Sequence, residues 1–132
     1  MIKIGIDVGS TTAKLVAVDE NDNLLFSKYE RHNAKAKETI LSFLKELLSE
    51  IGDKDISVRI TGSIGMGISE KCSLPFVQEV VAAAKAIQKD YSHVTSMIDI
   101  GGEDAKVVFF KDAEATDLRM NGNCAGGTGA FI

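Results

Sequence analysis

Residues 6–16 of the chain read IDVGSTTAKLV, and residues 98–108 read IDIGGEDAKVV. Six of the eleven aligned positions are identical, namely isoleucine, aspartate, glycine, alanine, lysine and valine. In both copies an apolar run is followed by a turn and a second apolar run, which is the pattern of a β-hairpin. The copies start 92 residues apart, at positions 6 and 98, and this spacing is a domain length and not a short structural repeat. The sequence therefore predicts two related lobes, each opening with the same hairpin.

The rest of the chain alternates helix and strand patterns. The clearest helix pattern places apolar residues at three- and four-residue steps over residues 40–51, directly before Gly52. A second helix is expected from about residue 75 to 91, after a glycine-rich loop at 62–67. Strands are expected at residues 2–8, 13–18, 24–30, 56–61, 95–100, 105–110 and 115–119.

Composition and charge narrow the class of protein. With 132 residues, of which 45% are hydrophobic and 26% charged, the chain has the composition of a folded globular protein. A formal net charge of -4 argues against a nucleic-acid or anionic-membrane partner bound by bulk charge. The first residues read as a strand and not as a secretory signal, and the two cysteines, Cys72 and Cys124, are too few for a disulfide framework. We therefore expect a cytoplasmic protein with reduced thiols and no membrane partner.

Each hairpin carries an aspartate at the end of its first strand and a glycine two positions later, Asp7 with Gly9 and Asp99 with Gly101. A glycine lets the backbone approach an anion closely, and the N–H groups of the turn can bind that anion. A carboxylate beside such a turn suits Mg²⁺, which takes one or two carboxylates together with water and phosphate oxygens. A single Asp-x-Gly turn is also common in plain hairpins, but here the matched pattern DxGxxxAK occurs twice. Two such turns could hold a polyphosphate from both sides.

Other phosphate-binding patterns are not satisfied. The P-loop pattern is broken because Thr128 stands where that motif requires a lysine. The dinucleotide-binding GxGxxG is broken because Glu70 stands at the position of its last glycine. These two classes of nucleotide-binding fold are therefore disfavoured.

The first hairpin resembles the phosphate-1 motif of the actin, sugar-kinase and chaperone ATPase superfamily, and DIGGEDAK resembles its phosphate-2 motif. More narrowly, the tracts GIDVGSTTAK, QEVVAAAKAI, IDIGGEDAKVV and MNGNCAGGTGAF occur in the order seen in activators of 2-hydroxyacyl-CoA dehydratases and in benzoyl-CoA reductase ATPase subunits, the BadF/BadG/BcrA/BcrD type. The resemblance covers essentially the whole chain. It implies an α/β, ribonuclease H-like (actin-like ATPase) lobe with a mixed sheet and flanking helices. Residues 1–92 would form this lobe with its connecting helix, and residues 93–132 the truncated start of a second lobe.

The resemblance also implies roles for individual residues. Asp7 and Asp99 would coordinate Mg²⁺ through water, and one of them would orient the attacking water. Two sets of residues would hold the terminal phosphates from opposite sides, Gly9, Ser10, Thr11, Thr12 and Lys14 from one and Gly101, Gly102 and Asp104 from the other. Asp104 could instead simply close its hairpin turn. Glu79 would reach the metal or would be an ordinary carboxylate on a helix surface, and Lys106 is read as a solvated strand residue.

Cys124 lies in the tract NCAGGTG. In the resembling activators this cysteine ligates a [4Fe-4S] cluster shared across a homodimer, and a four-iron cluster of this type needs four thiolates. Cys72 matches no family cysteine motif and is read as a structural thiol, so the second ligand would lie beyond Ile132. The cluster and the homodimer are therefore expected in the intact protein and not in this chain. His32 and His93 lie outside every motif and are expected at the surface or at strand edges.

The resemblance implies the N-terminal fragment of an ATP-dependent activator. ATP hydrolysis in the intact protein would drive an electron from the [4Fe-4S] cluster to a partner 2-hydroxyacyl-CoA dehydratase or related reductase. The parent protein would be an ATPase, whereas this chain alone would bind ATP weakly or not at all. Two alternatives stay open, a fragment of a sugar or carboxylate kinase of the same superfamily and a non-catalytic module that senses nucleotide. The NCAGGTG tract argues against the kinase.

Overall fold

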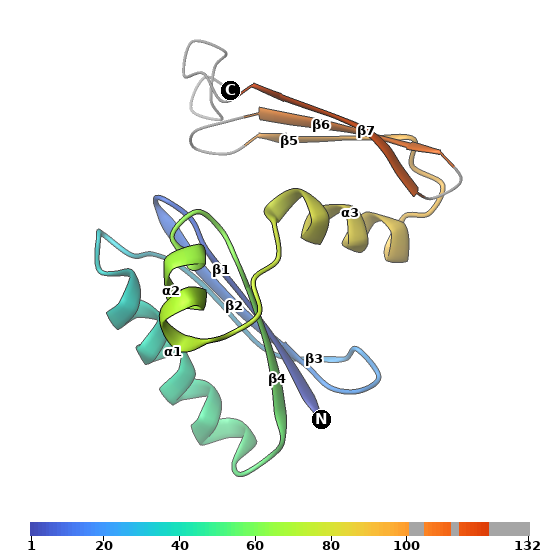
Figure 1. Cartoon of the computed structure of the whole chain (residues 1–132). Coiled ribbons are helices and arrows are strands. Elements are labelled where there is room, and N and C mark those ends of the chain that lie inside the picture. The colour runs from blue at the N-terminus through green and yellow to red at the C-terminus, as the bar shows by residue number, and fades with distance from the viewer. Residues whose placement is uncertain (101–104, 112–113, 122–132) are drawn as a thin grey trace. The chain divides into compact units, whose positions relative to one another are not determined.

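Figure 1 shows the computed structural model, which describes residues 1–100, 105–111 and 114–121. The chain forms two compact units, Met1–Gln78 and Glu79–Ile132, and each contains one of the two predicted hairpins. The connecting helix, which the resemblance groups with the first lobe up to residue 92, belongs to the second unit. Within the described ranges, no helix is both long and apolar enough to cross a membrane.

The first unit is built on a four-stranded mixed sheet in the order β3-β2-β1-β4. The strands β1 (Ile2–Val8), β2 (Thr12–Val18) and β3 (Leu24–Arg31) form an antiparallel meander. The chain then passes through α1 (Ala36–Ile51) to β4 (Ile56–Thr61), which pairs with β1 in parallel. A parallel return to the same sheet needs a crossover connection, and α1 provides it. The predicted strands and the first helix are confirmed.

The core of this unit lies between the sheet and α1. Alternate residues of β1 are buried, and the last of them, Val8, is 0% exposed. On α1 the buried residues Ile40, Phe43 and Leu47 recur at three- and four-residue steps, as the sequence pattern predicts. Each such side chain contributes roughly 1.5–3 kcal/mol when it is removed from water. This packing fixes the positions of the strand ends, where the candidate site lies.

A short helix, α2 (Gly65–Cys72), occupies part of the segment predicted to be a glycine-rich loop. The expectation of a loop there was wrong, because the glycine serves packing and not only turning. A Cβ added at Gly65 would lie 2.8 Å from Cγ2 of Ile60, so the helix can approach β4 this closely only without a side chain at that position. Cys72, at the end of α2, is exposed, which is not the position of a structural core thiol.

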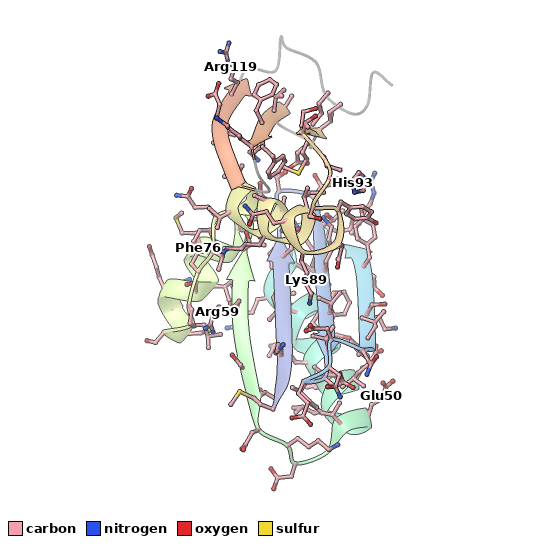
Figure 2. The ribbon with its side chains drawn as sticks, turned by 90° about the vertical axis from the view of Figure 1, so that its right-hand side faces the viewer. Glu50, Arg59, Phe76, Lys89, His93 and Arg119 are labelled. Atoms are coloured by element: carbon pink, nitrogen blue, oxygen red, sulfur yellow. The ribbon has the colours of Figure 1, made fainter. Side chains whose placement is uncertain are left out.

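The second predicted helix begins later than expected because the preceding residues extend alongside β4. Ile60 donates its N–H to the carbonyl of Pro75 at 3.0 Å, and Val77 donates to the carbonyl of Ile60 at 2.8 Å. Ile60 and Phe76 form an isolated parallel bridge, and Figure 2 shows Phe76 close to the strand that carries Arg59. The helix therefore begins at Glu79 and not near residue 75.

The second unit contains α3 (Glu79–Asp90) and the strands β5 (Ser96–Ile100), β6 (Ala105–Lys111) and β7 (Glu114–Asn121). These strands form an antiparallel sheet in the order β5-β6-β7, which confirms the strands predicted there. Its small core contains Ala84 of α3 with Val108 and Phe110 of β6.

Candidate functional site

The carboxyl ends of β1 and β4 meet at one edge of the first sheet. Because these strands are parallel, Asp7 and Thr61 lie side by side as register partners. Their neighbours Val8 and Ile60 are buried in the core, so alternation directs Asp7 and Thr61 to the opposite face of the sheet. Ligands of open α/β sheets bind outside the carboxyl ends of parallel strands. This edge is therefore the candidate site of the first unit.

Asp7 forms an ion pair with Lys14 across the first hairpin. The antiparallel register places the two residues opposite each other, and Nζ of Lys14 lies 3.1 Å from Oδ2 of Asp7. The same ammonium lies 5.4 Å from the centroid of the Tyr29 ring, on β3. A cation at this distance from an aromatic face is attracted by the ring. The carboxylate and the ring together hold the lysine amine beside the turn of the hairpin.

The turn of this hairpin presents its polar groups to solvent. Gly9 donates its N–H to the carbonyl of Thr12 at 3.0 Å, which closes the turn. Ser10 and Thr11 are exposed, and their hydroxyl oxygens lie 3.4 Å apart. The structure thus brings together all the residues predicted for one side of a phosphate site, namely Asp7, Gly9, Ser10, Thr11, Thr12 and Lys14.

The turn after β4 packs directly against the end of β1. Gly62 has a φ of +97°, and a Cβ added there would lie 2.2 Å from the carbonyl oxygen of Val8 and 2.8 Å from Oδ1 of Asp7. Ile64 donates its N–H to that same Val8 carbonyl at 3.0 Å. Only glycine allows both the backbone conformation and the close approach. Sequence patterns alone assigned no role to this glycine, although its position directly after a predicted strand was a usable signal.

Thr61 carries a buried hydroxyl beside the Asp7 carboxylate. In the part of the chain that the structure describes, Oγ1 of Thr61 is buried and has no hydrogen-bond partner. Buried polar groups are almost always hydrogen-bonded, so a group without a partner calls for an explanation such as a bound ion or ligand. This residue belongs to none of the motifs found in the sequence.

His32 is buried behind the turn, contrary to the expectation of a surface or strand-edge residue without a role. Only 4% of its surface is exposed. Its Nε2 lies 2.8 Å from the carbonyl oxygen of Gly9, and its Nδ1 lies 3.1 Å from the N–H of Ala34. Its own backbone N–H donates to the carbonyl of Thr11 at 3.2 Å. A single histidine after a strand carries no sequence signal for these contacts, which depend on tertiary structure. His93 is exposed, as expected.

The second hairpin has the same register but a different ion pair. Asp99 on β5 lies opposite Lys106 on β6, as Asp7 lies opposite Lys14. Lys106 is only 5% exposed, and its Nζ lies 2.9 Å from Oε2 of Glu79 at the start of α3. The prediction of a solvated Lys106 was therefore wrong, because the side chain points into the small core of the unit and pairs with a carboxylate. Glu79 is 40% exposed and is paired, so it is not an isolated surface carboxylate.

Several predicted site residues are not part of the described structure. Gly101, Gly102, Asp104 and Cys124 lie outside the described residues. Within those residues, no three Asp, Glu, His or Cys side chains gather into a group that could hold a metal by themselves. A metal ion at the first hairpin would therefore need water or ligand oxygens in addition to Asp7.

The chain matches one protein-family model and is similar to several known proteins. The model of the BadF/BadG/BcrA/BcrD ATPase family matches residues 4–132. The (R)-2-hydroxyglutaryl-CoA dehydratase activating ATPase of Acidaminococcus fermentans is 26% identical over 131 residues, covering 98% of this chain and 50% of that protein. The crystal structure of component A of the same organism's (R)-2-hydroxyglutaryl-CoA dehydratase is also 26% identical, with a TM-score of 0.82, and the match covers 99% of this chain and 51% of that one.

A third relative was solved with a nucleotide analogue. It is the activator of the 2-hydroxyisocaproyl-CoA dehydratase from Clostridium difficile with bound ADPNP, 28% identical, with a TM-score of 0.81. The match covers 99% of this chain and 49% of that one, so the chain spans about half the length of these relatives. The mixed sheet with its crossover helix is thus the ribonuclease H-like fold of actin-like ATPases, as the family resemblance implies.

Proposed function

Because the chain belongs to the BadF/BadG/BcrA/BcrD ATPase family, we propose that its first hairpin binds the terminal phosphates of ATP in complex with Mg²⁺. The observation that carries this proposal is the arrangement at the carboxyl end of β1. There the Asp7 carboxylate, the Lys14 ammonium and a turn with exposed hydroxyl groups belong to one hairpin. A bound ADPNP in a relative that is 28% identical supports the binding of an adenine nucleotide.

Lys14 supplies the positive charge for the phosphate. Its ion pair with Asp7 is partly exposed, with 44% of the lysine side chain and 32% of the aspartate side chain accessible. Exposed ion pairs contribute only about 0–1 kcal/mol, so a phosphate oxygen can take the place of the carboxylate at little cost. The hydroxyls of Ser10 and Thr11 can donate to the same phosphate oxygens. Tyr29 limits where the ammonium can move when the pair with Asp7 opens.

Mg²⁺ fits the donors at this edge of the sheet. The ion keeps several waters and binds through one or two carboxylates and the phosphates of its nucleotide. Asp7 supplies one carboxylate, and the unpartnered hydroxyl oxygen of Thr61 beside it can accept a hydrogen bond from a metal-bound water. When bound, the ion neutralises charge that develops on the phosphate oxygens. Asp99 is proposed as a second carboxylate, with Gly101, Gly102 and Asp104 on the other side of the phosphates.

We also propose an activity for the full-length protein. It would hydrolyse ATP and couple that hydrolysis to electron transfer from a [4Fe-4S] cluster to a 2-hydroxyacyl-CoA dehydratase or a related reductase. The relatives support this interpretation, because one is named an activating ATPase and another a dehydratase activator. Cys124 would be a cluster ligand within a homodimer. The exposed, free thiol of Cys72 is compatible with the reducing cytoplasm, where we place the protein.

Calorimetric titration of the full-length protein with ATP tests the proposal. We expect binding that requires Mg²⁺ and hydrolysis that releases inorganic phosphate. Tight binding without Mg²⁺ and without hydrolysis would indicate a nucleotide sensor. Transfer of the terminal phosphate to a sugar or a carboxylic acid would indicate a kinase. Either result would overturn the proposal of an ATP-driven activator.

A further inference from the structure

His32 contacts the candidate phosphate turn through both its backbone and its side chain. The backbone N–H donates to the carbonyl of Thr11 at 3.2 Å, and Nε2 lies 2.8 Å from the carbonyl oxygen of Gly9. The residue is 4% exposed, although it directly follows an edge strand. Two carbonyl groups of the turn are therefore held toward one buried residue.

The two side-chain contacts determine which ring nitrogen carries the proton. The backbone N–H of Ala34 can only donate, so Nδ1 of His32 must accept and carries no proton. The carbonyl oxygen of Gly9 can only accept, so Nε2 must carry the proton and donate it. The ring therefore adopts the single tautomer that its two partners fix, with the proton on Nε2.

The bond from Nε2 to the Gly9 carbonyl also sets the direction of the next backbone N–H group, that of Ser10. A trans peptide is planar, and its N–H points opposite to its C=O. With the Gly9 carbonyl held toward His32, the N–H of Ser10 points away from His32. With the Thr11 carbonyl held in the same way, the N–H of Thr12 points away as well. Backbone N–H groups directed to one side of a turn are the donors that bind anions in such loops.

We infer that His32 is a positioning residue for the phosphate-binding turn, in which its Nε2–H holds the Gly9 carbonyl so that the Ser10 N–H faces the bound phosphate. The inference rests on the proposed ATP binding by this hairpin and adds to it a residue outside the hairpin. His32 does not touch the nucleotide in this arrangement. Its effect reaches the phosphate through the orientation of one peptide unit.

A purely structural role for His32 would depend on its other ring nitrogen, Nδ1. Asn33 and Ala34 both have positive φ values, 49° and 62°, and the bond from the Ala34 N–H to Nδ1 supports this unusual turn before α1. If support of that turn were the whole role, Nδ1 would matter and Nε2 would not. The two nitrogens can be separated by substitution. The amide of glutamine lies as many bonds from Cβ as Nε2, whereas the amide of asparagine lies as many bonds from Cβ as Nδ1.

The test compares His32→Gln and His32→Asn in the full-length protein, with Mg-ATP as the probe. We measure the dissociation constant by calorimetry, KM and kcat for hydrolysis, and the thermal midpoint. The asparagine variant should bind Mg-ATP about tenfold more weakly, the effect of losing one hydrogen bond that orients the turn. Its KM should rise more than its kcat falls. The glutamine variant should bind Mg-ATP with an affinity within about threefold of that of the unsubstituted protein.

The outcomes separate this inference from the proposed function. If the unsubstituted protein does not bind Mg-ATP, the proposed function fails and the inference fails with it. If the unsubstituted protein binds and the asparagine variant binds equally well, only the role of His32 is overturned. Equal losses of affinity in both variants, in step with equal losses of thermal stability, would assign His32 to structure alone.

A measurement on the unsubstituted protein keeps the test decisive if the asparagine variant does not fold. In ¹⁵N NMR spectra, the Ser10 amide should shift on saturation with Mg-ATP while Nε2 of His32 keeps its proton. A Ser10 amide that does not shift at saturation, or a proton on Nδ1 in place of Nε2, would overturn the inference.

Discussion

The ammonium of Lys14 lies 3.1 Å from the carboxylate of Asp7, beside the turn of the first hairpin. The two residues are opposite each other in the antiparallel register, so the backbone and not a flexible loop sets their separation. Both side chains remain partly exposed, which leaves their charges accessible to an incoming ligand. The equivalent register in the second hairpin places Lys106 opposite Asp99, but there the lysine is buried and pairs with Glu79. The two hairpins thus share a backbone plan and differ in what their lysines can reach.

Replacing Asp7 with asparagine should abolish most of the ATP hydrolysis by the full-length protein. The substitution keeps the size of the side chain but removes the charge proposed to hold Mg²⁺, and the loss in kcat should be about 100-fold. Phosphate release from Mg-ATP measures it. The matched control is Asp22→Asn, which removes the carboxylate of another Lys–Asp pair, 3.0 Å from Lys3. Equal activity of the two variants would contradict the role of Asp7.

Lys14 should matter for affinity more than for stability. The substitution Lys14→Gln removes a charge-assisted contact to phosphate, and the dissociation constant for Mg-ATP should rise about 10- to 100-fold. Its thermal midpoint should change little, because the pair with Asp7 is partly exposed. Calorimetry on Lys14→Gln and on the control Lys3→Gln gives the comparison. An affinity that is unchanged in Lys14→Gln would mean that the phosphates bind elsewhere.

Substitution by alanine should have opposite effects on the free energy of unfolding at Gly62 and at Gly67. Gly62→Ala places a Cβ at a φ of +97°, against the carbonyl of Val8, and should lower the free energy of unfolding by about 2 kcal/mol or more. Gly67 lies in α2 with nothing within 4 Å of an added Cβ, so Gly67→Ala should raise that free energy by about 0.5 kcal/mol. Urea unfolding of the chain measures both. Similar stabilities of the two variants would contradict the close contact between Gly62 and the end of β1.

Substituting either partner of the ion pair between Lys106 and Glu79 should destabilise the second unit, but by different amounts. Glu79→Gln removes one partner of a lysine that is only 5% exposed, and should destabilise by about 1–3 kcal/mol, less than a fully buried pair because Glu79 is 40% exposed. Lys106→Met leaves a partly exposed carboxylate and an apolar core residue, and should cost less than about 1 kcal/mol. Urea unfolding ranks the two variants, with Glu46→Gln in the exposed pair with Lys28 as the control. The reverse order would contradict this account of the pair.

The elements that the sequence predicted are those with strong local patterns. Alternation in β1 and the three- and four-residue steps in α1 reflect burial of one face, so the order of residues alone indicates where these elements lie. The predicted residues of the first turn came together because a hairpin connects neighbours in sequence. The mixed sheet was implied by the family resemblance, and α1 between β3 and β4 provides its parallel connection.

The features that were missed depend on contacts between distant residues. His32 is buried because its ring meets Gly9, 23 positions earlier, and no local pattern encodes that meeting. Lys106 is buried because Glu79, 27 positions earlier, pairs with it. The glycine-rich stretch at 62–67 looked like a loop, whereas Gly65 begins α2 and is required by its contact with Ile60. In each case tertiary packing overrides what the local sequence favours.

Phosphate binding by the first hairpin is tested most directly by a structure of the full-length protein with Mg²⁺ and a non-hydrolysable ATP analogue. We expect terminal phosphate oxygens within hydrogen-bond distance of the Ser10–Thr12 turn and of Nζ of Lys14. We also expect the metal ion on the Asp7 side of the phosphates, linked to that carboxylate directly or through one water. A nucleotide bound away from the first hairpin, with the Lys14–Asp7 ion pair still closed, would contradict this expectation.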